Sequence, residues 1–332
     1  MVGAHVTDAW TREADRADDR YFATVFVNGL AAPLFMLLAG VALTMAAGSR
    51  ARRAGRTAAA GAALARGWQV LGLAFLFRVQ SQVLGWGAWI NLLKVDILNV
   101  MGVSMIAAAG LWRLLPSRPV RVVAYALVTT ACAFLTPVMP AQEWLAPLPD
   151  PIEWYLRPAP RRTWFTLIPW MGFLTAGALV GELLDAARTT AAERRLHVGL
   201  AVAAVAGVFG GWAASHLPSL YADADFWSTS PTFFFIRLGL VVAGLPLAWA
   251  LSASWEPLVT LGRSSLFVYW VHVELVYGVT GLPLKRLLPW EGAVVATGLV
   301  VVLMYRLVRR KDAWMARRAL PPRLTLLAPI LK

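Results

Sequence analysis

A histidine and an aspartate near the start of the chain are the pair best suited to chemistry. His5 and Asp8 lie in the stretch MVGAHVTDAW, and a spacing of three residues places both on one face of a helix. A carboxylate one turn from an imidazole can fix the tautomer of the ring and raise its basicity, as a general base requires. The alternative is that both side chains lie at a water-exposed helix end without a chemical role.

Polar side chains inside apolar runs are the next candidates. A charge at bilayer depth costs at least about 2.5 to 3.5 kcal/mol, so such groups pair with one another or line a cavity. Arg78 and Gln82 share a helix face by their i, i+4 spacing, and Asp96 and Asn99 share one by their i, i+3 spacing. We expect a buried ion pair between Arg78 and Asp96. Alternatively, Arg78 contacts a substrate carboxylate or a developing oxyanion.

Two further apolar runs carry polar residues. Tyr269 and His272 share a face of GRSSLFVYWVHVELVYG, and Arg237 lies within SPTFFFIRLGL. His272 either lines a reaction chamber or is a structural hydrogen-bonding group. Arg237 is expected to be a buried cation, and its sequence neighbours identify no partner for it.

The composition indicates which elements position these residues. Of the 332 residues 59% are hydrophobic and 15% charged, and the mean hydropathy is +0.61, whereas roughly a quarter of a soluble domain is charged. In lipid every backbone polar group must be satisfied within its own segment, so apolar runs of roughly 20 residues form helices. We therefore predict an all-α, polytopic transmembrane helix bundle.

Nine apolar runs are predicted as full spans, preceded by a truncated first span. The chain, residues 1–332, is treated as a single transmembrane domain, in which residues 1–10 are the remnant of the first helix and residues 309–332 a basic cytoplasmic tail. The predicted full spans are residues 24–47, 66–88, 97–114, 120–140, 164–184, 197–215, 232–251, 263–281 and 291–308.

The charge pattern predicts orientation. The formal net charge is +13, but the basic residues form short clusters between apolar runs, which argues against nucleic acid as a partner. Alternate loops are rich in arginine, and the positive-inside rule places them and the C-terminus in the cytoplasm. We expect an integral protein of a bacterial-type cytoplasmic (inner) membrane. The sequence shows no metal-ligand cluster, and its single Cys132 cannot form a disulfide within the chain.

One predicted outer loop departs from this rule. The segment from Pro140 to Trp164 carries Arg157, Arg161 and Arg162 and is rich in proline and tryptophan. We interpret it as an ordered cap whose arginines meet an anionic or sugar-bearing acceptor. Arginines at lipid headgroups are the alternative.

Five stretches, in order along the chain, resemble one family. MVGAHVTDAW, VNGLAAPLFMLLAGVAL, VDILNVMGVSM, FTLIPWMGFLTAGALVG and LGRSSLFVYWVHVELVY are similar to the heparan-alpha-glucosaminide N-acetyltransferase catalytic-domain family, within the clan of multi-span membrane acyltransferases. The resemblance implies a transferase that moves an acetyl or other acyl group from cytoplasmic acyl-CoA to a sugar-like acceptor outside. At the matching positions it implies roles for His5, for the pair Asn28 and Gly29, and for His272.

The chain departs from the family pattern in two places. It starts only four residues before His5, where the family has an upstream Asp-x-x-Arg-Gly-like segment, so we expect a start assigned too late or a truncated helix. No histidine lies between Asp8 and Asn28, the stretch in which lysosomal members carry their active histidine. The match to His5 is therefore one of region rather than of residue.

The leading hypothesis is acyl transfer in an intramembrane chamber. His5, oriented by Asp8, would deprotonate an acceptor hydroxyl or amine. Acetyl-CoA or another acyl-CoA is the expected co-substrate, with no permanently bound cofactor and no metal. The expected partners are the lipid bilayer and an extracytoplasmic glycan or sugar acceptor, and a homodimer is left open. The arginines expected to hold the acyl-CoA phosphates, unless the positive-inside rule alone accounts for them, are Arg50, Arg52, Arg53 and Arg56.

Two other classes of function are left open. A transporter or flippase for a lipid-linked or anionic solute would also need buried Arg78, Asp96 and Arg237. The sequence lacks the internal repeat common in secondary transporters, which disfavours this alternative. A catalytically inactive membrane scaffold is the third hypothesis.

Overall fold

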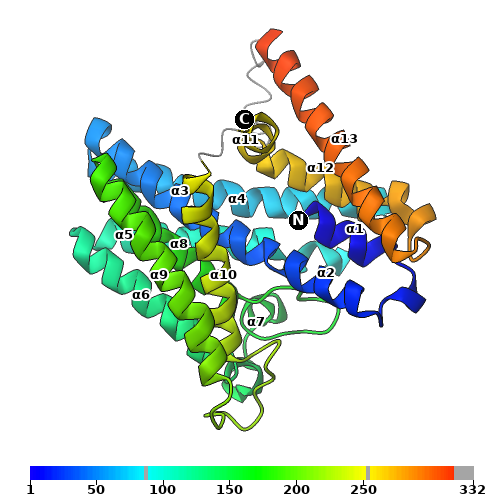
Figure 1. Cartoon of the computed structure of the whole chain (residues 1–332), viewed down its shortest axis with the longest axis horizontal. Coiled ribbons are helices and arrows are strands. Elements are labelled where there is room, and N and C mark those ends of the chain that lie inside the picture. Colours follow the sequence, from blue (N-terminus) through cyan, green and yellow to red (C-terminus); the bar gives the residue numbers. More distant parts are fainter. Residues whose placement is uncertain (86–88, 252–254, 318–332) are drawn as a thin grey trace. The chain divides into compact units, whose positions relative to one another are not determined.

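A computed structural model describes residues 1–85, 89–251 and 255–317 (Figure 1). Within these ranges the regular secondary structure is helical, apart from two isolated β-bridges. This confirms the predicted all-α class. Part of the predicted basic tail, residues 318–332, lies outside the described residues, and residues 309–317 continue the last helix.

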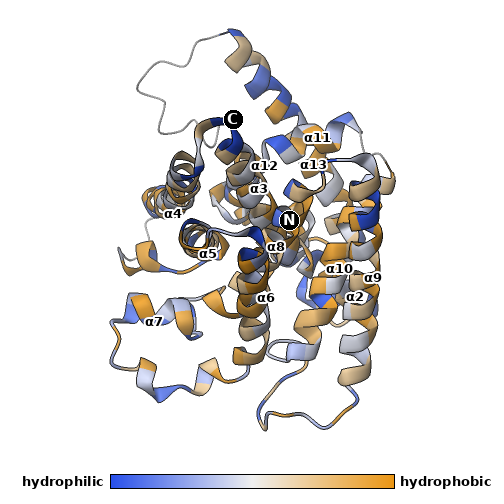
Figure 2. Ribbon diagram, turned by 90° about the vertical axis from the view of Figure 1, so that its left-hand side faces the viewer, coloured by the Kyte–Doolittle hydropathy of each residue, from blue (hydrophilic) through white to orange (hydrophobic). Residues whose placement is uncertain are grey.

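Most of the helices are long. Figure 2 shows apolar residues along their length and hydrophilic residues mainly near helix ends and in loops. The α-helices are α1 (Val2–Trp10), α2 (Asp19–Gly29), α3 (Ala31–Ala54), α4 (Arg56–Gly85), α5 (Ile97–Leu114), α6 (Arg118–Leu135), α7 (Asp150–Leu156), α8 (Leu167–Ala186), α9 (Thr190–Ala214), α10 (Pro231–Ala250), α11 (Glu256–Arg263), α12 (Ser265–Tyr277) and α13 (Trp290–Arg317).

Eight helical segments of the described chain are long and apolar enough to cross a membrane, as judged by length and composition. The first of them, Asp19–Ala54, joins α2 and α3. The predicted run 263–281 contains the shorter apolar helix α12, which ends at Tyr277 and is followed by a 3-10 segment. The polytopic membrane bundle is thus confirmed, and the number of nine full spans stays a prediction.

The chain divides into two compact units. Unit 1 comprises Met1–Ala31, Val79–Gly87 and Ser252–Lys332, and unit 2 comprises Ala32–Arg78 and Ala88–Leu251. The residues of each unit pack mainly against other residues of the same unit. That residues 1–332 form a single transmembrane domain stays a prediction.

In unit 2, α3 and α8 pack closely because glycines remove side chains from their interface. A Cβ on Gly40 would overlap the main-chain carbonyl of Leu174, and a Cβ on Gly177 would overlap that of Leu37. The Thr44 hydroxyl donates a 3.0 Å hydrogen bond to a main-chain carbonyl of α8. Small residues are how membrane helices gain close van der Waals contact, since apolar burial alone does not drive helices together in lipid. Elsewhere in this unit α9 and α10 run side by side (Figure 1).

In unit 1, α1 packs against α12 and α13. Their shared core consists of Val6, Ala9, Trp10, Val276, Val300 and Met304. The indole of Trp10 also donates a 3.2 Å hydrogen bond to the main-chain carbonyl of Val276. This core fixes the face of α1 that is turned toward α12.

Main-chain hydrogen bonds hold the end of α1 against the segment before α13. Leu288 N donates to the Trp10 carbonyl at 2.9 Å, and Arg12 N donates to the Leu288 carbonyl at 2.8 Å. The carboxylate of Asp15 accepts a 2.8 Å hydrogen bond from the amide of Trp290, the first residue of α13. These contacts make α1 an integral part of unit 1.

Candidate functional site

The candidate site in unit 1 is a pair of histidines. α1 carries His5 and α12 carries His272, and their Nδ1 and Nε2 atoms lie 2.9 Å apart. The planes of the two rings are nearly parallel, with centroids 4.9 Å apart and an interplanar angle of 16°. His272 is fully buried and His5 is half-buried. The structure thus joins two residues that the sequence singled out separately.

Two tyrosines make edge contacts with the pair: the ring of Tyr269 contacts both histidines, and the ring of Tyr277 contacts His5. Tyr269, which is buried, lies 6.3 Å from the His5 ring centroid and 5.9 Å from that of His272. Tyr277 lies 5.4 Å from the His5 ring, at an interplanar angle of 64°. These aromatic walls restrict the orientation of both imidazoles.

Asp8 takes a different position from the one we expected. Its carboxylate accepts a 2.9 Å hydrogen bond from the Tyr277 hydroxyl and forms a 3.3 Å ion pair with Arg16. It is exposed, and neither contact involves His5. The expectation that Asp8 orients His5 directly is therefore corrected. The link between them is indirect: Asp8 accepts from the hydroxyl of Tyr277, and the ring of Tyr277 contacts the ring of His5. The catalytic assignment of both residues stays a prediction.

Asn28 in α2 supports the turn of α1 that carries His5. Its amide nitrogen donates to the Thr7 hydroxyl at 3.1 Å, and that hydroxyl donates to the Gly3 carbonyl at 2.7 Å. A Cβ on Gly3 would lie only 2.9 Å from Asn28 Oδ1, so the absence of a side chain at Gly3 makes room for the amide. Asn28 therefore positions α1 in the structure, and a contact with substrate stays a prediction.

The end of α4 that belongs to unit 1 helps to set the rotation of α12. Trp270 donates a 2.6 Å hydrogen bond to Gln80, and Glu274 accepts one of 2.7 Å from Ser81. Trp270 and Glu274 are four residues apart, so they share the face of α12 that meets α4. His272 lies between them in sequence and points to α1. Gln82, the predicted site residue of this segment, is half-buried near the end of α4.

In unit 2, Arg78 and Asp96 form the expected ion pair. The Nη2–Oδ2 distance is 2.6 Å, and the two side chains are 16% and 10% exposed. Asp96 also caps α5: its Oδ1 accepts from the amides of Leu98 and Asn99, while Asn99 Oδ1 accepts from the amide of Asp96. This capping box gives Asp96 and Asn99 a structural role. A contact of Arg78 with substrate stays a prediction.

Arg237 is surrounded by aromatic rings. Its guanidinium lies 5.2 Å from the ring centroid of Trp170, 5.5 Å from that of Phe173 and 5.4 Å from that of Phe233. Cation–π attraction of this kind strengthens where water is excluded. The neighbours of Arg237 in the sequence identified no partner for it, and the fold supplies these three rings.

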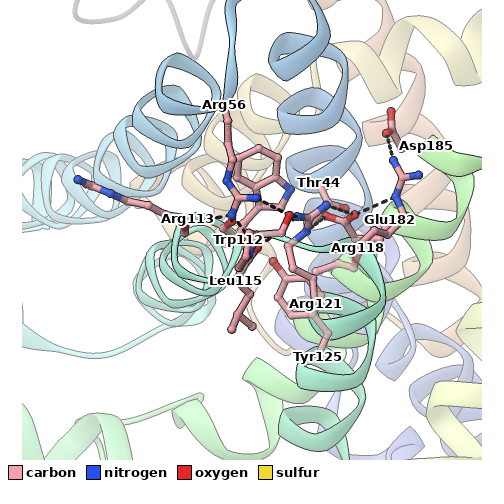
Figure 3. A network of polar contacts seen from close by, with 12 residues as sticks. Thr44, Arg56, Trp112, Arg113, Leu115, Arg118, Arg121, Tyr125, Glu182 and Asp185 are labelled. Carbon is pink, nitrogen blue, oxygen red and sulfur yellow. Dashed lines mark hydrogen bonds and ion pairs between the residues drawn. The ribbon is translucent and has the colours of Figure 1, made fainter.

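A network of arginines and carboxylates joins α6 to α8 in unit 2 (Figure 3). Arg121 holds Glu182 with two hydrogen bonds of 2.8 Å. Arg118 and Arg52 each approach Asp185 at 2.7 Å. Glu182 and Asp185 were not among the site residues predicted from the sequence. Two carboxylates three residues apart at the end of a span, between arginine-rich loops, were the signal that could have identified them.

The four arginines expected to bind acyl-CoA divide into two kinds. Arg52 pairs with Asp185, and Arg56 donates to the carbonyls of Trp112 and Leu115 at the C-terminal end of α5, at 2.8 and 2.6 Å. Cations are favourable at that end of a helix. Arg50 and Arg53 are exposed and form no ion pair or hydrogen bond through their side chains with the described part of the chain. Of the four, only Arg50 and Arg53 therefore have side chains without a partner among the described residues.

Two arginines of the predicted outer cap contact protein groups. Arg157 pairs with Glu153, and the guanidinium of Arg162 lies 5.6 Å from the ring centroid of Trp154. Arg161 is exposed and has a positive φ of 63°. These contacts support an ordered segment, and its interaction with a glycan stays a prediction.

Comparison with known proteins identifies the family. The family model described as "Heparan-alpha-glucosaminide N-acetyltransferase, catalytic" matches residues 5–215. No curated protein and no solved structure matches the chain. The match begins at His5 and ends before α10, so His272 lies beyond it. Because the match covers more than half of the sequence, this integral membrane protein belongs to the heparan-alpha-glucosaminide N-acetyltransferase catalytic-domain family, whose activity is that of a membrane acetyltransferase.

Proposed function

We propose that this enzyme moves an acetyl or other acyl group from cytoplasmic acyl-CoA to a hydroxyl or amine of a sugar-like acceptor on the opposite side of the membrane, and that His5 is its general base. The observation that carries the proposal is the 2.9 Å hydrogen bond between His5 and His272 in a chain of this family. An imidazole held by one ring nitrogen presents the other in a defined direction, as proton abstraction requires.

The proposed step is a direct transfer. As the acyl acceptor attacks the thioester carbon, its proton passes to His5, the new bond to the acyl carbon forms and the carbon–sulfur bond breaks. The CoA thiolate leaves and takes the proton from the imidazolium, which returns His5 to its neutral form. A positioned general base contributes roughly 10²- to 10⁴-fold to such a rate.

The donor would be held at the exposed arginines of α3. Arg50 and Arg53 are available to phosphate groups, whereas Arg52 and Arg56 already bind protein groups. Isothermal titration of acetyl-CoA into the purified enzyme should therefore show binding that weakens about 10-fold in the double variant Arg50→Gln, Arg53→Gln, since a charge-assisted hydrogen bond contributes about 1.5 to 3 kcal/mol, less where it is exposed. Arg194→Gln, another exposed arginine without a described side-chain partner, is the matched control. Equal affinity in all variants would contradict this donor subsite.

The test of the proposed function uses the protein in liposomes, with acetyl-CoA on one side and glucosamine as the probe acceptor. His5→Ala should lower transfer at least about 100-fold while the protein keeps its wild-type melting temperature. His216→Ala changes an exposed histidine at the end of α9 and should leave the rate unchanged. Full activity in His5→Ala would contradict the assignment.

The direction of transfer has its own test. In a Cys132→Ala background, single cysteines replace Arg50 in α3 or Trp144, which is 65% exposed in the proposed outer cap. A membrane-impermeant maleimide added to intact cells should label position 144 and not position 50. Labelling with the opposite pattern would reverse the proposed topology and place the C-terminus outside.

A further inference from the structure

We propose that His272 is a positioning residue that selects the tautomer of His5, so that Nε2 of His5 is the atom that takes the proton of the acyl acceptor. This inference rests on the proposed function of His5 as the general base. It goes beyond the family match, because His272 lies outside the matched residues 5–215.

The selection begins at the backbone of α12. Nδ1 of His272 lies at hydrogen-bond distance from the main-chain carbonyl of Val268, one helical turn earlier. A carbonyl oxygen only accepts hydrogen bonds, so Nδ1 of His272 carries the hydrogen. A neutral imidazole has one donor nitrogen and one acceptor nitrogen, and Nε2 of His272 is therefore the acceptor.

The same logic passes to the second ring. Nε2 of His272 lies 2.9 Å from Nδ1 of His5, and because the former accepts, the latter donates. The lone pair of neutral His5 is then on Nε2. His272 is fully buried and His5 half-buried, so the chain of hydrogen bonds runs from the interior of unit 1 toward its more accessible end. Among the described residues, no group other than His272 hydrogen-bonds to the ring of His5.

This arrangement also suits the charged state of the reaction. When Nε2 of His5 takes the proton, Nδ1 keeps its hydrogen and continues to donate to His272. The imidazolium is thus stabilised by an acceptor that is already in place, and the proton leaves again from Nε2 to the CoA thiolate. Without the acceptor at position 272, the tautomer with hydrogen on Nε2 becomes accessible, and its lone pair points at α12 instead of the acyl acceptor.

Two substitutions of His272 separate positioning from packing. The side-chain oxygen of His272→Gln can still accept from His5, whereas His272→Leu provides volume without an acceptor. We expect kcat to fall about 100-fold in the leucine variant, with KM for acetyl-CoA unchanged, and to recover to within about 10-fold of wild type in the glutamine variant. A leucine variant with wild-type kcat would overturn the inference.

The chain offers a matched control. Nδ1 of His216 lies 2.9 Å from the carbonyl of Trp212, four residues earlier, which is the local contact that His272 makes with Val268. Unlike His272, His216 is exposed and bonds to no second histidine among the described residues. His216→Leu removes the same local hydrogen bond and should leave kcat unchanged.

A spectroscopic measurement tests the tautomers without any assay of activity. The chain has four histidines, so nitrogen-15 NMR of the histidine-labelled enzyme can be assigned by substituting them one at a time. We expect hydrogen on Nδ1 of both His5 and His272 in the wild type, and its appearance on Nε2 of His5 in His272→Leu. A wild-type spectrum with hydrogen on Nε2 of His5 would overturn the inference even if the leucine variant failed to fold.

The outcomes distinguish the two proposals. An active His5→Ala variant, together with the expected wild-type tautomers, would refute the general base and leave His272 as the residue that sets the ring of His5. An inactive His5→Ala variant, together with a fully active His272→Leu variant, would refute the positioning role alone.

Discussion

Replacing Arg121 by leucine should destabilise the folded enzyme by about 3 kcal/mol, because it leaves the carboxylate of Glu182 buried with too few partners. The side chain of Glu182 is 2% exposed and that of Arg121 is 8% exposed. Removing one partner of such a buried pair costs roughly 3 to 5 kcal/mol. Arg118 remains 3.3 Å from Glu182, and we therefore expect the lower end of this range.

This free energy corresponds to a change of more than about 100-fold in the unfolding equilibrium constant. It can be measured by unfolding in mixed micelles of increasing SDS fraction, with tryptophan fluorescence as the signal. Arg113→Leu provides the control, because Arg113 is exposed in the same region (Figure 3) and its loss should change stability by less than about 0.5 kcal/mol.

The double variant Arg121→Leu, Glu182→Leu sharpens the test. An apolar pair of similar volume is often as stable as a buried ion pair, so the second substitution should recover at least half of the loss. A loss below about 1 kcal/mol in Arg121→Leu, or a double variant whose loss equals the sum of the single ones, would refute the reasoning.

Three further outcomes follow from the fold. Gly177→Ala should lower the free energy of unfolding by about 1 to 3 kcal/mol, because a Cβ there overlaps α3. Its control is Gly199→Ala, where a Cβ lies in open space, and this variant should be neutral or stabilising by up to about 1 kcal/mol. Asp96→Asn should keep the N-cap of α5 but lose the ion pair with Arg78. Asp96→Ala loses both and should be about 1 kcal/mol less stable than Asp96→Asn. Equal melting temperatures of the two variants would contradict the capping role. The hydrogen bonds from Arg12 and from the amide of Trp290 lower the pKa of Asp15 from its ordinary value of 3.8. The stability that Asp15 contributes is therefore complete above that pH and is lost as the pH falls through the lowered pKa. The difference in Tm between wild type and Asp15→Asn, measured by calorimetry, should shrink below about pH 4, and a difference that stays constant would contradict both hydrogen bonds.

The helices were predictable because lipid admits few alternatives for an apolar run. The predicted span 97–114 coincides with α5. Elsewhere the helices extend past the apolar runs, as α3 does to Ala54 and α13 to Arg317, because basic residues continue a helix into water without cost to its backbone hydrogen bonds. The shortening of the run 263–281 to α12 reflects Gly278, which leaves the helical conformation at the C-cap.

The site was predictable only in part, and sequence distance is the reason. Arg78 and Asp96 are neighbours across one hairpin, so their depth in adjacent spans identified the ion pair that the structure confirms. His5 and His272 are 267 residues apart, and helical spacing carries no information over such a distance. The sequence likewise matched Asp8 with its nearest histidine, whereas the fold brings Tyr277, 269 residues away, and the nearby Arg16 to its carboxylate.

The main-chain hydrogen bonds between the end of α1 and the segment before α13 have a consequence for biosynthesis. The ribosome makes α1 before unit 2 and Leu288 only after all of unit 2 has been translated, yet the end of α1 and Leu288 are joined by main-chain hydrogen bonds. The nascent chain therefore holds α1 without α12 and α13 while the intervening helices enter the membrane. His5 acquires its setting when α12 and α13 are inserted, so an arrested or prematurely terminated chain would carry the histidine but not the arrangement that orients it.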